Sequence, residues 1–148
     1  MKTNRNRGFS LLELLIVVAI ILIIATIAIP SLLRSRQAAN ESSAVANLRT
    51  INTAEVTYLS SAGGNFGTLG GLIAAGLLDN RFATTVSGYV FTVAASGSDY
   101  TATGTPTSTN SGRFGYVSGP DAVIRYQGTA GGNCVPCFPT GQSGAPVQ

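Results

Sequence analysis

The sequence predicts an α+β protein in which a long N-terminal helix, with a hydrophobic half and an amphipathic half, packs on a small four-stranded antiparallel sheet. Three observations predict it: an apolar run over residues 9–33, apolar spacing of three and four over 34–60, and short alternating stretches between 88 and 127. The chain accordingly divides into five parts, with boundaries at residues 1–8, 9–33, 34–60, 61–127 and 128–148.

The positive charge of the chain is concentrated at its N-terminus. Lys2, Arg5 and Arg7 lie in the first eight residues, which contain no acid. Without these three cations, the formal net charge falls from +3 to zero, because six Arg then balance six acidic residues. The charge therefore does not indicate a specific nucleic-acid site.

The apolar run over residues 9–33 is long enough to cross a membrane. A helix rises about 1.5 Å per residue and needs about 20 residues to span a bilayer. The basic residues precede the run, which predicts a cytoplasmic N-terminus and places the rest of the chain outside. Pro30 lacks an N–H group, so we expect a helix kink there. Two ordinary alternatives for this run are a cleaved secretory signal and an unspecialised membrane anchor. A cleaved signal usually has a shorter apolar core than the one found here.

One carboxylate, Glu13, interrupts the apolar run. An acidic side chain in hydrocarbon costs about 2.5–3.5 kcal/mol on insertion scales, so its presence there suggests a function. Two simpler interpretations are pairing within the same chain and snorkelling of the carboxylate to the lipid headgroups.

The first thirty residues resemble the type IV prepilin signature. A short basic leader ends at Gly8, Phe9 follows it, and Glu13 occupies the fifth position after Gly8, before an unbroken apolar run. The resemblance implies that prepilin peptidase cleaves between Gly8 and Phe9 and that the new N-terminal Phe9 is N-methylated. Residues 1–8 would then be a cleaved leader.

The resemblance also implies a role for Glu13 in assembly. Cleavage creates a positive amine at Phe9, and opposite charges in a low-dielectric medium attract strongly. In a filament, the Phe9 amine of an incoming subunit would pair with Glu13 of a neighbour and fix the axial register. Self-pairing or snorkelling would then describe the monomer before assembly.

The helix is predicted to continue as an amphipathic half over residues 34–60 and to end at Ser60, Ser61, Gly63 and Gly64. Its apolar stripe comprises Val45, Leu48, Ile51, Ala54 and Tyr58. Its opposite, polar face comprises Arg36, Asn40, Asn47, Arg49 and Glu55.

The head is predicted from turn signals and alternation. Residues 68–79 form a candidate short helix, and 101–112 read as a polar loop. The four predicted strands cover residues 88–94, 99–103, 113–118 and 122–127. Five Gly and three Pro in the 21 residues from 128 to 148 indicate a tail or wrapping loop.

Cys134 and Cys137 form a Cys-x-x-Cys motif. Haem attachment requires a following His, zinc requires about four ligands, and thioredoxin-like redox chemistry requires a βαβ context; the chain has no His. An exported domain favours a disulfide between the two, although so short a loop gives little entropic stabilisation. Pilins often carry a C-terminal disulfide across a longer loop.

No catalytic, cofactor-binding or metal site is predicted. No acidic residues lie close together in the sequence, and there is no His to act as a base. Some pseudopilins bind calcium in the head, and Asp99 and Asp121 could do so with loop carbonyls, but two scattered acids are poor evidence.

We therefore expect a structural subunit of a type IV pilus, serving adhesion, twitching motility or DNA uptake. Its expected partners are other copies of itself in a helical homopolymer, prepilin peptidase, the inner-membrane pilus assembly machinery, and the membrane before assembly. The precursor would lie in the inner membrane and the mature subunit in an extracellular filament. The alternatives are a pseudopilin of a type II secretion system, in a periplasmic pseudopilus, and a single-span anchored binding module that never polymerises.

Overall fold

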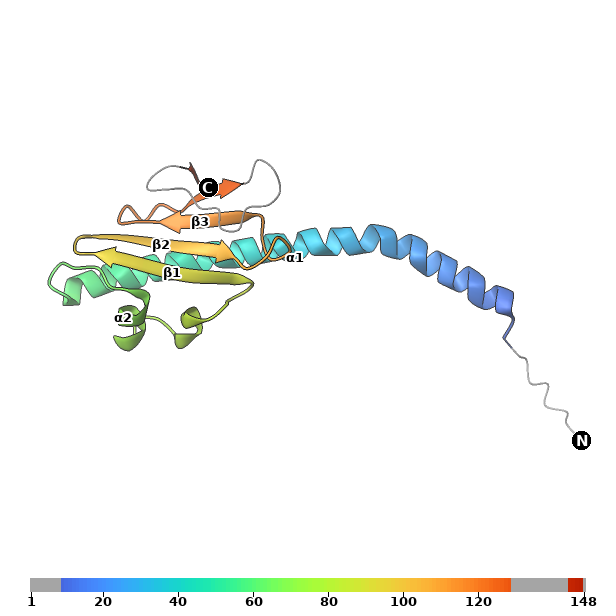
Figure 1. Ribbon diagram of the computed structural model, residues 1–148, viewed down its shortest axis with the longest axis horizontal. Coiled ribbons are helices and arrows are strands. Elements are labelled where there is room, and N and C mark those ends of the chain that lie inside the picture. The colour runs from blue at the N-terminus through green and yellow to red at the C-terminus, as the bar shows by residue number, and fades with distance from the viewer. Residues whose placement is uncertain (1–8, 129–143, 148) are drawn as a thin grey trace, which may run out of the picture. The chain divides into compact units, whose positions relative to one another are not determined.

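The computed structural model of the protein describes residues 9–128 and 144–147 (Figure 1). Its longest element is helix α1 (Leu11–Ser61), of 51 residues. The chain divides into two compact units, residues 1–35 and residues 36–148. The leader with Gly8, and both Cys134 and Cys137, lie outside the described residues.

The described part of the first unit consists of Phe9, Ser10 and the first half of α1. The carbonyl of Ser10 accepts the backbone N–H groups of Glu13 and Leu14 at 3.1 and 3.2 Å, which begins the helix. Pro30 lies inside α1, and the kink at this residue remains a prediction.

The second unit contains the rest of α1 and a five-stranded antiparallel sheet in the order β1-β2-β3-β4-β5 (Figure 1). The strands are β1 (Tyr89–Ser96), β2 (Asp99–Pro106), β3 (Phe114–Ser118), β4 (Arg125–Gly128) and β5 (Ala145–Pro146). The α+β fold with a long N-terminal helix and an antiparallel sheet is therefore confirmed.

The predicted number of strands was wrong by one. The fifth strand, β5, comes from the Gly/Pro-rich tail, where Ala145 pairs with Tyr126 and Pro146 with Arg125. A two-residue strand is too short to show alternation in the sequence. Pro146 is tolerated because β5 is the last strand in the sheet order, where a missing N–H breaks no further pairing.

The polar loop predicted over residues 101–112 was also placed wrongly. Strand β2 continues to Pro106, and its residues pair with β1 from Tyr89↔Pro106 to Ser96↔Asp99. Alternate residues of β1, namely Tyr89, Phe91 and Val93, are buried, and β2 follows the register that this face imposes. The connection between β2 and β3 is thus shorter than expected, spanning residues 107–113.

Between α1 and the sheet lie a short helix and a 3-10 turn. Helix α2 (Leu69–Ala74) begins at Thr68, whose hydroxyl accepts the N–H of Gly71 at 3.3 Å. The 3-10 turn η1 (Asn80–Ala83) is capped by Asp79, whose Oδ1 accepts the N–H of Arg81 at 2.7 Å. The candidate helix over residues 68–79 therefore ends earlier than predicted.

The core of the second unit lies between α1 and one face of the sheet. From α1 it contains the predicted stripe residues Val45, Leu48, Ile51 and Ala54, with Tyr58 packed against them. The predicted polar face was wrong at two positions, because Asn47 and Glu55 are buried. Both side chains find hydrogen-bond partners inside the unit, Asn47 at Ser43 Oγ (3.4 Å) and Glu55 at the Gly67 N–H (2.9 Å).

Candidate functional site: the N-terminal apolar helix and the polar contacts of the head

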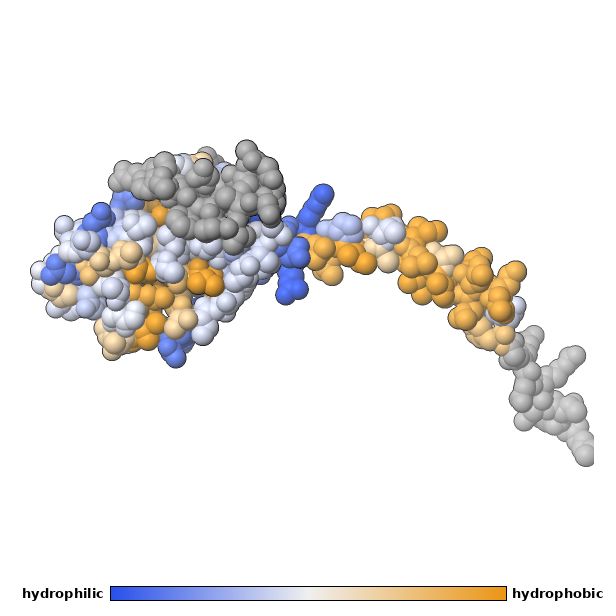
Figure 2. All heavy atoms as spheres, viewed as in Figure 1, coloured by the Kyte–Doolittle hydropathy of each residue, from blue (hydrophilic) through white to orange (hydrophobic). Residues whose placement is uncertain are grey.

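The first unit presents an apolar helix surface to its surroundings (Figure 2). Every described residue before Arg36 is exposed except Ala25, which is partly buried, and Leu11 is 81% exposed. A contiguous apolar surface of this kind marks a site of protein or membrane interaction. By length and composition, α1 is apolar enough to cross a membrane.

Glu13 lies in the first turn of α1, one turn beyond Phe9, and both side chains are exposed. It is the only charged residue in the apolar segment 9–33. Two ion pairs form among the described residues, and Glu13 belongs to neither. Its place near the helix N-terminus is favourable because the peptide dipoles there carry partial positive charge.

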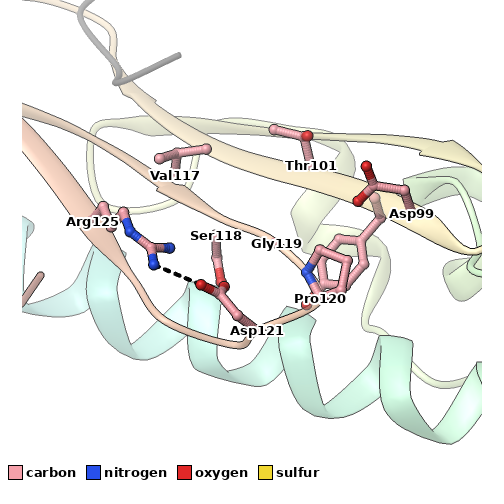
Figure 3. A pocket seen from close by; sticks show the side chains of 9 residues that line it. Asp99, Thr101, Val117, Ser118, Gly119, Pro120, Asp121 and Arg125 are labelled. Carbon is pink, nitrogen blue, oxygen red and sulfur yellow. Dashed lines mark hydrogen bonds and ion pairs between the residues drawn. The ribbon is translucent and has the colours of Figure 1, made fainter. Parts of the chain in front are cut away.

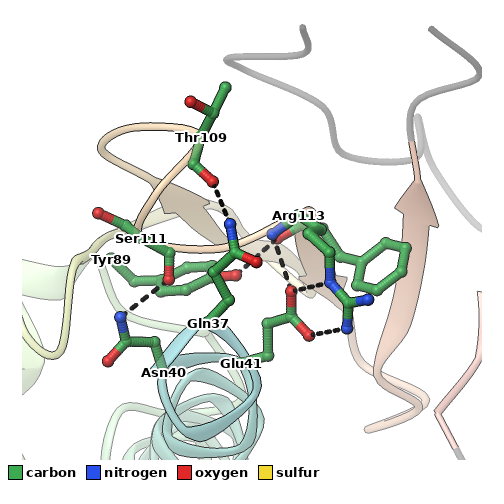
Figure 4. Close-up of polar contacts among 8 residues, drawn as sticks. Gln37, Asn40, Glu41, Tyr89, Thr109, Ser111 and Arg113 are labelled. Atoms are coloured by element: carbon green, nitrogen blue, oxygen red, sulfur yellow. Dashed lines mark hydrogen bonds and ion pairs between the residues drawn. The ribbon is translucent and has the colours of Figure 1, made fainter. Parts of the chain in front are cut away.

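In the second unit, polar side chains of α1 hold the loop between β2 and β3 (Figure 4). Gln37 Nε2 donates to the Thr109 carbonyl at 2.7 Å, and Asn40 Nδ2 donates to the Ser111 carbonyl at 2.9 Å. These residues and Glu41 lie within about one helical turn of each other, so they share one face of α1. We call this set of contacts the polar clamp.

Glu41 is the centre of the polar clamp. Its Oε1 accepts the Arg113 backbone N–H at 2.8 Å and the Arg113 Nε at 3.1 Å, while Oε2 accepts Nη2 at 2.9 Å. The hydrogen bond with Glu41 raises the pKa of Arg113 above its usual value. Because the carboxylate is buried, this bidentate pair also satisfies a charge that would otherwise lack solvation.

Two buried tyrosines border the same region. Tyr89 donates its hydroxyl to the Phe114 carbonyl at 2.9 Å, and burial raises its pKa above the usual range. Burial, followed by the negative charge of Glu41, raises the pKa of Tyr116 to about 12. Both hydroxyls therefore stay neutral at physiological pH and act as hydrogen-bonding groups.

The two acids considered for calcium line one small pocket (Figure 3). Asp121 is already paired, since Arg125 Nη2 donates to its Oδ2 at 2.6 Å, and this bond lowers the pKa of Asp121. Asp99 lies away from Arg125 in this view. No group of three or more His, Cys, Asp or Glu side chains converges in the part of the chain that the structure describes.

A buried polar triad lies between α1 and the sheet, and sequence reasoning did not anticipate it. Asn52 Nδ2 donates to Ser118 Oγ at 2.8 Å, and Asn52 Oδ1 accepts the Tyr100 hydroxyl at 3.1 Å. Asn52 sits one residue after Ile51 of the apolar stripe, so its position on the helix was the one available signal.

Residues 3–29 match the family model described as the prokaryotic N-terminal methylation motif. The chain is also 48% identical over 56 residues to the type IV major pilin protein PilA of Myxococcus xanthus (strain DK1622). These two findings support a type IV pilin. The match covers 38% of this chain and 26% of the relative, so it spans about a quarter of that pilin's length. No solved structure matches the chain.

Proposed function

We propose that this protein is a structural, non-catalytic subunit of a type IV pilus that polymerises through the apolar half of α1. The observation that carries the proposal is an exposed apolar helix, with a single carboxylate in its first turn, inside a methylation motif. In the monomer, lipid must shield this apolar surface from water. In a filament, the apolar helices of neighbouring copies pack against it and shield it instead.

Processing precedes assembly in this proposal. Prepilin peptidase cuts between Gly8 and Phe9 and the new N-terminus of Phe9 is methylated, while the precursor lies in the inner membrane with its N-terminus cytoplasmic. The inner-membrane pilus assembly machinery then transfers the subunit to an extracellular filament. Cys134 and Cys137 form a disulfide in the exported domain, because the compartment is oxidising.

Glu13 supplies register in the filament. The apolar surface of α1 is nearly uniform, so packing alone distinguishes poorly between axial offsets of two helices. One carboxylate on each helix, facing one amine on the next, favours a single offset because every other leaves two charges unpaired in an apolar medium. The proposed partner is therefore the Phe9 amine of a neighbouring copy.

The test is to express the chain in a host that has prepilin peptidase and the assembly machinery but lacks its own pilins. Surface material released by shear is imaged with antibody against the head. We expect labelled filaments from the natural sequence and none from a Gly8→Leu variant, which blocks cleavage. Natural chain that is processed but found solely in the membrane would contradict the proposal.

A further inference from the structure

Glu55 is a completely buried carboxyl group on α1 with an incomplete set of hydrogen bonds. Its exposed fraction is 0%, and its Oε2 accepts the backbone N–H of Gly67 at 2.9 Å. Its Oε1 is buried and has no hydrogen-bond partner. An ionised carboxylate accepts several hydrogen bonds in water, so burial with one donor favours the neutral acid.

The group that Glu55 holds is the segment between α1 and α2, residues 62–68. The segment leaves the helix through Gly63 and Gly64, whose φ angles of 65° and 88° suit glycine. Besides the bond from the Gly67 N–H to Glu55, the N–H groups of Ala62 and Gly64 donate to the Tyr58 and Leu59 carbonyls of α1 at 2.8 and 3.1 Å. The Phe66 N–H donates to the Gly97 carbonyl at 2.9 Å, and its ring packs on Tyr100 with the centroids 4.6 Å apart. Among the described residues, Glu55 is thus the side chain of α1 that forms a hydrogen bond with this segment.

The surroundings of Gly67 are closely packed. A Cβ atom at this position would lie 3.1 Å from the Tyr58 ring and 3.3 Å from Leu72. Water can thus reach the Glu55 carboxyl only if the segment moves. Gly63, Gly64 and Asn65 are exposed, whereas Phe66 is half-buried and Gly67 is buried, so admitting water to Glu55 displaces Phe66 and Gly67 from their contacts with the core.

Among the described residues, no cationic side chain pairs with Glu55. The described ion pairs do not include it, and neither residues 62–68 nor α2 contains a titratable side chain. The titratable groups nearby are Tyr58 on α1 and Tyr100 on β2. Burial first, and the Glu55 charge second, raise the pKa of Tyr100 to about 12, so this phenol stays neutral at physiological pH and offers Glu55 no charge.

We propose that Glu55 is a proton-operated latch that holds residues 62–68 against α1 when its carboxyl is neutral and releases them when it ionises. The neutral carbonyl oxygen accepts the Gly67 N–H without the desolvation cost of a charge. On ionisation, the carboxylate gains more from water than from this single donor, and the segment opens to admit it.

The sign of the pH dependence follows from linkage. Burial raises the pKa of Glu55 in the closed state, while in the open state the group returns to its ordinary value. The latch is therefore fully closed below that ordinary value and weakens as pH rises toward the raised one. Since one proton is involved, the opening constant rises by up to about tenfold per pH unit in this window and then levels off.

The experiment is amide hydrogen exchange of the full chain in detergent micelles from about pH 4 to about pH 8. Opening of residues 62–68 is measured in the natural chain and in a Glu55→Gln variant, which keeps the shape of the side chain but cannot ionise. Their ratio cancels the intrinsic pH dependence of exchange. We expect this ratio to rise by up to about tenfold per pH unit and then level off. A constant ratio, or one that falls as pH rises, would overturn the proposal.

Two controls complete the design. An Asp99→Asn variant removes an exposed carboxylate of the same head and should leave the exchange of residues 62–68 unchanged. Direct carbon-13 titration does not need the Glu55 variant to fold. In a Glu13→Gln chain two Glu carboxyls remain, and we expect one to titrate above the ordinary value. If both titrate at or below that value, the latch does not exist.

Discussion

At the scale of single residues, Glu13 is the most informative position. Its charge is costly in lipid, and it stabilises assembly only when the Phe9 amine of a neighbouring copy pairs with it. We expect Glu13→Leu to insert into the membrane at least as well as the natural chain. The Phe9 amine of each incoming subunit would then be buried without its partner, at a cost of about 3–5 kcal/mol. Filaments should be lost or rare while processed protein accumulates in the membrane.

The measurement compares filament yield with membrane-retained protein, in cells that lack other pilins. A Thr26→Val variant is the matched control, since it removes a polar side chain from the same segment without removing a charge. The Thr26 hydroxyl bonds to the Ile23 carbonyl of its own helix at 2.7 Å, so we expect natural filament yield from this control. The same yield from Glu13→Leu would show that Glu13 has another purpose.

Gly112 is a residue at which a single methyl group should disturb the head. A Cβ atom there would overlap the Tyr89 hydroxyl and lie 2.6 Å from Tyr89 Cζ, and this ring cannot move without losing its bond to the Phe114 carbonyl. We expect Gly112→Ala to lower the free energy of unfolding by about 1–3 kcal/mol. Chemical denaturation checks this value, with Gly70→Ala as control.

Gly70 suits this comparison because it has open space at the Cβ position and lies in a helix, where Ala is preferred. Gly70→Ala should therefore leave stability unchanged or raise it slightly. Equal destabilisation by both substitutions would mean that chain flexibility, rather than overlap with Tyr89, sets the cost at Gly112.

At the scale of elements, the polar clamp joins α1 to the β2–β3 loop through the Glu41–Arg113 pair. The guanidinium is more than half exposed, whereas the carboxylate is buried, so solvent screens part of the attraction. A double-mutant cycle with Glu41→Gln and Arg113→Met should give a coupling free energy of about 1 kcal/mol. Urea unfolding of the four proteins provides this number.

The single variants of that cycle should differ in a defined direction. Arg113→Met leaves the buried Glu41 carboxylate with the Arg113 backbone N–H alone, so it should destabilise the head more than the double variant does. Additive effects of the two substitutions would show that the loop is held by Gln37 and Asn40 without help from the ion pair.

The elements also show what a sequence can and cannot predict. Helix α1 and strands β1 to β4 were anticipated because hydrophobic spacing of three and four, and alternation by two, directly reflect which face is buried. Strand β5 was missed because two residues are too few to show an alternation of apolar and polar side chains. Glu55 and Asn47 were assigned to a solvent-exposed face because polar residues on a helix were assumed to be exposed. Each is buried with a hydrogen-bond partner that the sequence does not identify. The placement of Phe9 and Glu13 at the start of α1 needed nothing beyond local spacing.

At the scale of the whole molecule, two carboxyl groups oppose each other in their effect on pH stability. The Asp121–Arg125 hydrogen bond lowers the pKa of Asp121, so its contribution is present above the ordinary Asp value and is lost as pH falls through the lowered one. Glu55 acts in the opposite direction. We therefore expect the unfolding midpoint of Asp121→Asn to fall less steeply at acid pH than that of the natural chain. If the two chains lose stability equally at acid pH, groups other than Asp121 cause the acid unfolding.

The last prediction concerns how processing changes the whole chain. The leader carries the three excess cations, so cleavage after Gly8 converts a chain of net charge +3 into one whose side chains balance. The one positive group left at that end of the apolar segment is the new amine of Phe9, which therefore becomes the partner available to Glu13. Mass spectrometry of the mature chain should find N-methyl-Phe9 as its first residue. An intact Met1, or cleavage beyond Ala28, would remove the charge pair on which the proposed assembly depends.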